Sequence, residues 1–203
     1  MKQNELFSLI KHADYKTVGD DLDYCVTEIG GRPALLFQGS MTLRDYVNDF
    51  KFARKLYKNQ TSCMVVHGGF GRLWKSGNDQ VVYDISQACL KHPNATPIIA
   101  GWSLGGAIAL LAVEDLFWRT GWKADVFTFG APKVCGTSKT AEYINQCGCI
   151  IQYRQPNDAV PYTPPLPGFC HADSHWVGRK FNLIEILKIK KYHIGYGKEE
   201  LYD

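Results

Sequence analysis

The sequence predicts an α/β fold, in which a mostly parallel β-sheet is flanked by helices on both faces. Three observations support it: β-prone apolar runs alternate with stretches of helical periodicity, glycines end several of these runs, and the composition is globular. Hydrophobic residues make up 45% of the chain and charged residues 21%, unlike disordered, collagen-like or coiled-coil chains. The length of 203 residues predicts a single domain over residues 1–203.

Charge and hydropathy patterning exclude several classes of function. The 23 basic and 20 acidic side chains are mixed along the chain, so no polybasic arm indicates a nucleic-acid partner. The densest lysine cluster, in LIEILKIKKYH, is interpreted as a solvated surface rather than a membrane-binding patch. The sequence contains no apolar run long enough to span a bilayer, and its start contains no apolar stretch of signal-peptide length.

The seven cysteines bear on the compartment and on metal binding. An odd number cannot pair completely within a monomer, and reduced thiols in a cytoplasmic protein are the simplest interpretation. Together with the lack of a signal-like segment, this predicts a cytoplasmic location. Cys147 and Cys149 are separated by one residue, a spacing that zinc sites do not use, so we expect no metal site.

The first third of the chain is expected to contain a helix, a hairpin and a second helix. The first dozen residues carry Leu6, Leu9 and Ile10 at helical spacing. DLDYCVTEIG and RPALLFQG flank two successive glycines and are typical of a β-hairpin. Residues 42–57 again have helical spacing, behind Thr42 as a candidate cap.

The rest of the chain predicts strands that alternate with helices. SCMVV is a short β-prone run, and a helical stretch from about Leu73 to Leu90 follows it. TPIIAG is expected to be a buried strand, and SLGGAIALLAVEDLFWRTG a helix that Gly121 ends. ADVFTFG and GCIIQYRQ are two further predicted strands, separated by a helix over residues 137–146. HWVG is a further predicted strand near the end.

The stretch GWSLG, between a predicted strand and a predicted helix, is the strongest functional signal. A phosphate-binding loop is excluded because the stretch has neither the lysine nor the glycine spacing of such loops. The pattern indicates a nucleophile elbow, a strained turn that exposes Ser103 at the carboxyl edge of the sheet between Gly101 and Gly105. The Leu104 amide at the helix start is then a candidate oxyanion donor. The alternative is a serine that merely fits a tight turn.

A serine nucleophile needs a base to take its proton and an acid to orient that base. Asp158 follows the strand CIIQYR at the carboxyl edge, whereas Asp125 opens its strand at the opposite edge. Asn-Asp beside prolines is also an ordinary turn signal, which is the alternative for Asp158. Spacing and loop position favour His193 as the base, with His171 and His175 as alternatives.

Seven segments in order resemble the class 3 lipases, the fungal-type branch of the α/β-hydrolases. They span residues 35–197 and read LLFQGS, VVHGGF, GWSLGGAIALL, FTFGAPKVCG, NDAVPYTPP, GFCHADSHWV and HIGYG. The resemblance implies a compact version of the α/β-hydrolase fold of that family. It also implies that Ser103 is the nucleophile, Asp158 the acid and His193 the base.

The resemblance implies further roles around the same site. Ser40 matches the family residue whose amide and hydroxyl serve the oxyanion hole, with Leu104 as the second amide donor. Residues 42–54 occupy the place where the family carries a helical lid. His171 matches a family histidine that is not the base.

We therefore expect a serine hydrolase that cleaves carboxylic esters of lipids through an acyl-enzyme, with no metal and no organic cofactor. Its partners would be a lipid or small ester and, transiently, a membrane surface, but no nucleic acid. Four apolar residues are candidates for substrate contact, although residues of this kind also fill cores: Phe70, Trp74, Trp102 and Leu166. The alternatives are a catalytically silent interaction module and an acyltransferase.

Overall fold

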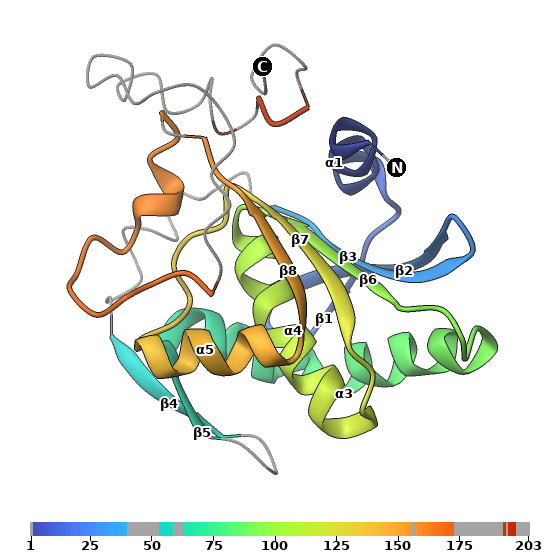
Figure 1. Cartoon of the computed structure of the whole chain (residues 1–203), viewed down its shortest axis with the longest axis horizontal. Coiled ribbons are helices and arrows are strands. Elements are labelled where there is room, and N and C mark those ends of the chain that lie inside the picture. Colours follow the sequence, from blue (N-terminus) through green and yellow to red (C-terminus); the bar gives the residue numbers. More distant parts are fainter. Residues whose placement is uncertain are drawn as a thin grey trace.

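A computed structural model describes residues 2–39, 53–58, 63–155, 157–172, 193 and 195–197. A six-stranded sheet runs through it in the order β1-β2-β3-β6-β7-β8 (Figure 1). Its strands are β1 (Lys16–Val18), β2 (Leu22–Ile29), β3 (Arg32–Phe37), β6 (Ile98–Trp102), β7 (Ala124–Phe129) and β8 (Gly148–Tyr153). Strands β3, β6, β7 and β8 pair in parallel, while β1 and β2 are antiparallel. The predicted mostly parallel sheet is confirmed.

Helices cover both faces of this sheet. Helix α1 (Gln3–His12) packs on one face, and α3 (Gly68–Lys91), α4 (Leu104–Thr120) and α5 (Ser138–Gln146) pack on the other (Figure 1). Side chains alternate across a strand, so Leu35 and Phe37 join the core beneath α3 and α4. Their neighbours Ala34 and Leu36 join the core beneath α1. None of the described helices is long and apolar enough to cross a membrane.

Local signals placed several turns and caps correctly. Gly30 and Gly31 both have positive φ, 58° and 76°, and close the two-residue hairpin between β2 and β3. Gly121 ends α4 in the left-handed conformation, as predicted. Thr137, predicted as the first residue of a helix, instead caps α5 by accepting the Thr140 N–H at 3.2 Å. Helix α1 is present, but Leu9 is 44% exposed and does not belong to its buried face.

The helix predicted over residues 42–57 is wrong at its end. Arg54–Lys58 form strand β4, which pairs antiparallel with β5 (Cys63–His67) in a separate two-stranded sheet. Tyr57 is buried there against the core, so pairing and burial override the local helical spacing. Residues 42–52, the remainder of that helix and most of the predicted lid, lie outside the described residues, as does HWVG.

Helix α3 begins at Gly68, five residues earlier than predicted. Its glycine-rich start is typical of a loop, but here the glycines allow close packing against β4 and β5. A Cβ on Gly68 would lie 2.6 Å from Lys55 Cγ, and one on Gly71 would lie 3.0 Å from Val66 Cγ2. Tertiary contact therefore decides where this helix starts.

Candidate active site

Ser103 occupies a sharp turn between the end of β6 and the start of α4. Its backbone has φ 57° and ψ −121°, a conformation that residues with a Cβ rarely adopt. The Ser103 N–H donates to the Phe129 carbonyl at the end of β7, over 2.8 Å, and this bond helps to hold the strained turn. The strand-to-helix turn predicted from GWSLG is present.

The glycines of GWSLG are explained by the close packing of α4 against the sheet. A Cβ on Gly101 would lie 2.2 Å from the Gly105 carbonyl oxygen, and one on Gly105 would lie 2.4 Å from the Phe37 carbonyl oxygen. Both clashes involve backbone, which has little room to move. Glycine at these positions lets α4 begin directly against the ends of β6 and β3.

The Ser103 side chain is fully buried, and its Oγ has no hydrogen-bond partner in the described part of the chain. A buried hydroxyl without a partner costs about 1–3 kcal/mol, so a purely structural role leaves this serine unexplained. Leu104 starts α4, and the first amides of a helix have no partner within it. The Leu104 N–H and the positive end of the helix dipole therefore lie next to Ser103.

Asp158 and His193, distant in the sequence, are in direct contact. His193 Nδ1 lies 2.8 Å from Asp158 Oδ2. The same oxygen accepts the Tyr196 hydroxyl over 2.8 Å, and Asp158 Oδ1 accepts the Val160 N–H over 3.0 Å. These three donors satisfy a carboxylate that is fully buried.

The contact with Asp158 determines what the other imidazole nitrogen can do. When Nδ1–H donates to the carboxylate, Nε2 of the neutral ring carries a lone pair and can accept a proton. His193 Nε2 is buried and has no hydrogen-bond partner among the residues described. The tautomer that donates from Nδ1 to Asp158 is the one that a general base requires.

Trp102 and Gly130 connect the serine turn to the Asp158–His193 pair. Trp102 precedes Ser103, and its Nε1–H donates to the His193 carbonyl over 3.0 Å while the two rings lie 5.4 Å apart. Gly130 follows Phe129, and a Cβ on it would lie 2.8 Å from Asp158 Oδ2 and 3.1 Å from His193 Nδ1. Ser103, Asp158 and His193 therefore gather at the carboxyl edge of the sheet.

Sequence reasoning missed two of these supporting residues. Tyr196 is fully buried, and its hydroxyl both donates to Asp158 and accepts the Gln155 N–H over 3.1 Å. Its place three residues after His193 in HIGYG was the available signal. Gly130 has φ 60°, and its only signal was the glycine that ends ADVFTFG.

The alternative bases have different surroundings. His171 Nε2 lies 2.7 Å from the Pro161 carbonyl oxygen and Nδ1 lies 3.2 Å from Gln152 Oε1. Burial, followed by the charge of Arg154, lowers the pKa of His171 to about 3. Because both ring nitrogens have partners other than Ser103, this placement disfavours His171 as the base. His175 lies outside the described residues.

The other predicted site residues lie in varied environments. Trp74 is fully buried and its Nε1–H donates to Asp115 Oδ2 over 3.0 Å, so its place is in the core and not at the surface that a substrate would contact. Phe70 is also buried in the core, whereas Leu166 is 42% exposed on the segment that follows Asp158. Ser40, the predicted oxyanion residue, lies outside the described residues.

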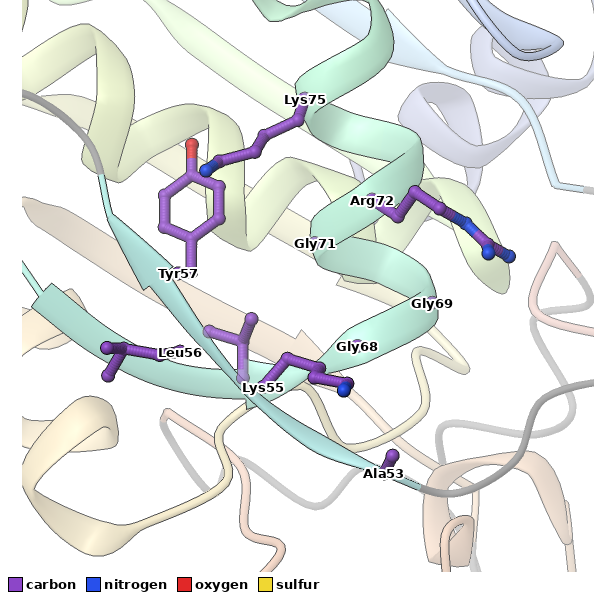
Figure 2. Close-up of a pocket in the computed structure, with 10 residues that line it drawn as sticks. Ala53, Lys55, Leu56, Tyr57, Gly68, Gly69, Gly71, Arg72 and Lys75 are labelled. Carbon is purple, nitrogen blue, oxygen red and sulfur yellow. The ribbon is translucent and has the colours of Figure 1, made fainter.

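A hollow of about 700 Å³ opens between β4 and the start of α3, lined partly by Tyr57 and Val66 (Figure 2). Its cationic side chains are Lys55, Arg72 and Lys75, and the Lys75 ammonium lies 5.2 Å from the centre of the Tyr57 ring. None of Ser103, Asp158 and His193 lines it, so it is separate from the candidate active site.

Lowering the pH from 7 to 5 should destabilise the protein, because the buried His67 and the half-buried His171 both resist protonation. Burial lowers the pKa of His67 to about 4, and that of His171 is about 3. Both side chains have a pKa of about 6.5 in the unfolded chain. Between that pKa and the lower pKa of the folded state, the unfolded chain binds more protons, so the free energy of unfolding decreases as the pH is lowered. We expect about 2 kcal/mol less unfolding free energy at pH 5 from His67 alone, measured by urea denaturation.

The matched variants for this experiment are His67→Gln and His12→Gln. His67→Gln should reduce the difference between the unfolding free energies at pH 7 and pH 5. His12→Gln, at an exposed position, should leave that difference unchanged. An unaltered pH dependence in His67→Gln would contradict the assignment.

Comparison with known proteins identifies relatives across most of this chain. Residues 34–167 match the family model described as Lipase (class 3). The chain is 29% identical to secreted mono- and diacylglycerol lipase A of Penicillium camembertii, over 79% of this chain and 53% of that protein. It is 35% identical to a lipase of Rhizopus niveus, over 68% of this chain and 36% of that protein. The chain thus spans about half the length of these relatives or less.

Solved structures agree with this comparison. A structure described as "A serine protease triad forms the catalytic centre of a triacylglycerol lipase" superposes with a TM-score of 0.72 and 27% sequence identity. The match covers 81% of this chain and 65% of that chain. The α/β-hydrolase fold predicted from the resemblance is confirmed.

The predicted cytoplasmic location is wrong. The relatives from Penicillium camembertii, Penicillium cyclopium and Fusarium solani are named as secreted lipases, which points to an extracellular location. An odd cysteine count does not require a reducing compartment, because it leaves only one thiol unpaired and the others able to pair.

Family membership is consistent with the local structure as well as with the overall match. The strained serine turn and the mostly parallel sheet belong to residues within or beside the matched range. The matched range covers well over half of the chain. This chain belongs to the class 3 lipase family.

Proposed function

We propose that this protein is a serine hydrolase that cleaves carboxylic esters of lipids, with Ser103 as nucleophile, His193 as base and Asp158 as acid. The observation that carries the proposal is the 2.8 Å contact between His193 Nδ1 and Asp158 Oδ2 at the sheet edge where Ser103 lies. The Ser103 hydroxyl and His193 Nε2 are the two atoms that must exchange a proton, and each lacks another partner within the described ranges.

The reaction begins when His193 Nε2 takes the proton of Ser103 Oγ as that oxygen attacks the ester carbonyl. The resulting imidazolium returns the proton to the departing alcohol, and an acyl-serine remains. Water then loses a proton to His193 and attacks the acyl group. Collapse of this second intermediate releases the acid and restores Ser103.

Charge develops at two places during each step, and the chain offers a group for each. The negative carbonyl oxygen would be held by the Leu104 amide at the start of α4, with Ser40 as the second donor that the family resemblance implies. One such donor is typically worth about 3–4 kcal/mol in the transition state. The positive imidazolium lies against Asp158, whose buried carboxylate is oriented by Tyr196 and Val160.

The proposed substrate is the ester bond of a glycerolipid presented at a lipid surface. Relatives of this chain are named as mono- and diacylglycerol lipases, which supports an acylglycerol substrate. On the segment after Asp158, Tyr162 and Leu166 are 37% and 42% exposed, so apolar groups are available for contact with lipid. Trp102 is buried beside His193 and donates to its carbonyl, so it positions His193 rather than offering exposed surface to an acyl chain.

Turnover of a panel of esters tests this proposal. We expect release of fatty acid from mono- and diacylglycerols to exceed release from phosphatidylcholine and from p-nitrophenyl butyrate, and to be absent in Ser103→Ala. Formation of a new ester on addition of an alcohol would instead indicate an acyltransferase. A folded protein that turns over no ester would indicate a catalytically silent interaction module.

A further inference from the structure

Two cysteines outside the candidate active site lie directly opposite each other. Cys135, in the loop after β7, and Cys170, in the segment after Asp158, form an isolated antiparallel bridge. The Cys170 N–H donates to the Cys135 carbonyl over 2.9 Å, and Cys170 Sγ lies 3.8 Å from the same oxygen. Opposed residues in antiparallel pairs have Cα atoms about 4.5–5.5 Å apart, within the range that a disulfide spans.

The surroundings suit these thiols to disulfide exchange. Cys135 is fully buried and Cys170 is half-buried, so an external reagent reaches Cys170 first. A hydrogen bond between the two thiols, then the charges of Lys133 and Arg54, lower the pKa of Cys170 to about 7. The same hydrogen bond, together with burial, raises the pKa of the Cys135 thiol. Cys170 is therefore the thiolate that attacks, and Cys135 is the thiol that follows.

We propose that Cys135 and Cys170 form an intramolecular disulfide when the protein meets a low-molecular-weight disulfide in an oxidising compartment. The Cys170 thiolate attacks one sulfur of that reagent, and the first small thiolate leaves. Cys135 loses its proton and attacks Cys170 Sγ, and the second small thiolate leaves. Two protein thiols are oxidised to one disulfide, while the reagent is reduced to two thiols that take up the protons.

The inference fits the corrected location and is independent of the proposed hydrolase activity. Disulfides persist in the compartments that secreted proteins enter, and relatives of this chain are named as secreted. Cysteines 135 and 170 lie 35 positions apart, and the loop between them contains Asp158. The disulfide would add a covalent link to the hydrogen bonds that already join the two segments. One of these is donated by the Lys133 N–H to the Thr163 carbonyl over 2.7 Å.

Closing this loop restricts the unfolded chain, so the oxidised protein should unfold at a higher temperature by about 5–10 °C. Ester turnover at room temperature should not change, because the contact between Asp158 and His193 is already made without the disulfide. The proposed disulfide would thus stabilise the segment that contains Asp158 without regulating ester turnover.

The test incubates the full chain with oxidised glutathione under native conditions, blocks the remaining thiols with N-ethylmaleimide and maps the digest by mass spectrometry. We expect a peptide cross-linked through Cys135 and Cys170, no N-ethylmaleimide on either of these two cysteines, and the upward shift of the unfolding temperature. Cys170→Ser should lose all three results. Cys149→Ser, at an exposed cysteine, should keep the cross-link and the shift.

Two outcomes would overturn the inference. One is Cys170 carrying glutathione while Cys135 remains a free thiol, which would show that the second exchange does not occur. The other is a cross-link between different cysteines with none between Cys135 and Cys170. Because the readouts are a mass and an unfolding temperature, failure of the proposed hydrolase activity would not affect them.

Discussion

Replacing Ser103 with alanine should abolish ester hydrolysis while leaving the protein folded. If Ser103 is the nucleophile, its loss removes the covalent route, and in serine hydrolases such a loss costs on the order of 10⁴–10⁶ in kcat. Stability should not fall, because the Ser103 hydroxyl is buried and has no partner among the described residues whose bond would be lost. We therefore expect an unfolding temperature equal to that of the parent protein or several degrees above it.

Turnover of a p-nitrophenyl ester and labelling by a fluorophosphonate measure this effect independently. The parent protein should incorporate the label at Ser103, and Ser103→Ala should incorporate none. The matched control is Ser86→Ala on α3, where the lost hydroxyl donates to the Val82 carbonyl over 2.6 Å. That control should keep both turnover and labelling. Labelling of Ser103→Ala equal to the parent would mean that another residue is the nucleophile.

Replacing His193 with alanine should lower turnover by a factor on the order of 10³–10⁶, because Ser103 would lose the group that takes its proton. The change also leaves the buried Asp158 without its imidazole partner, so some loss of stability is expected. Turnover is therefore measured per folded molecule. Free imidazole added to the solution should restore part of the activity, since it can occupy the space vacated beside Trp102 and supply the missing base.

The matched control is His171→Ala, which removes another histidine, half-buried, from the segment that follows Asp158. Its ring nitrogens lie beside Pro161 and Gln152, so the variant should unfold at a lower temperature yet retain turnover per folded molecule and show no response to imidazole. If His171→Ala lost turnover and His193→Ala kept it, the proposed base would be wrong.

Much of the fold could be predicted because local signals agree with the tertiary structure. The Gly30–Gly31 turn and the Gly121 cap each follow from the chemistry of one or two residues, and both are present. The turn that carries Ser103 is similar, since its small residues are required wherever a helix begins directly against a strand. That residues 1–203 form a single domain stays a prediction.

The mistaken elements are those where distant contacts override local preference. Residues 54–58 have helical spacing, yet they pair with β5 and bury Tyr57. The start of α3 looks like a loop until the packing of Gly71 against Val66 is known. Trp74 was a reasonable candidate for substrate contact by residue type, but its position in the core and its bond to Asp115 could not be read from the sequence.

The sequence by itself determined the α/β class and the strained serine turn, because each depends on residue type and short-range spacing. Only the tertiary structure decided that Asp158 and His193 are in contact, that Tyr196 holds the acid, and that Cys135 opposes Cys170. The physical reason is that these pairs lie 35 to 38 positions apart in the chain. Such pairs meet only when the parallel strands bring their carboxyl ends to one edge.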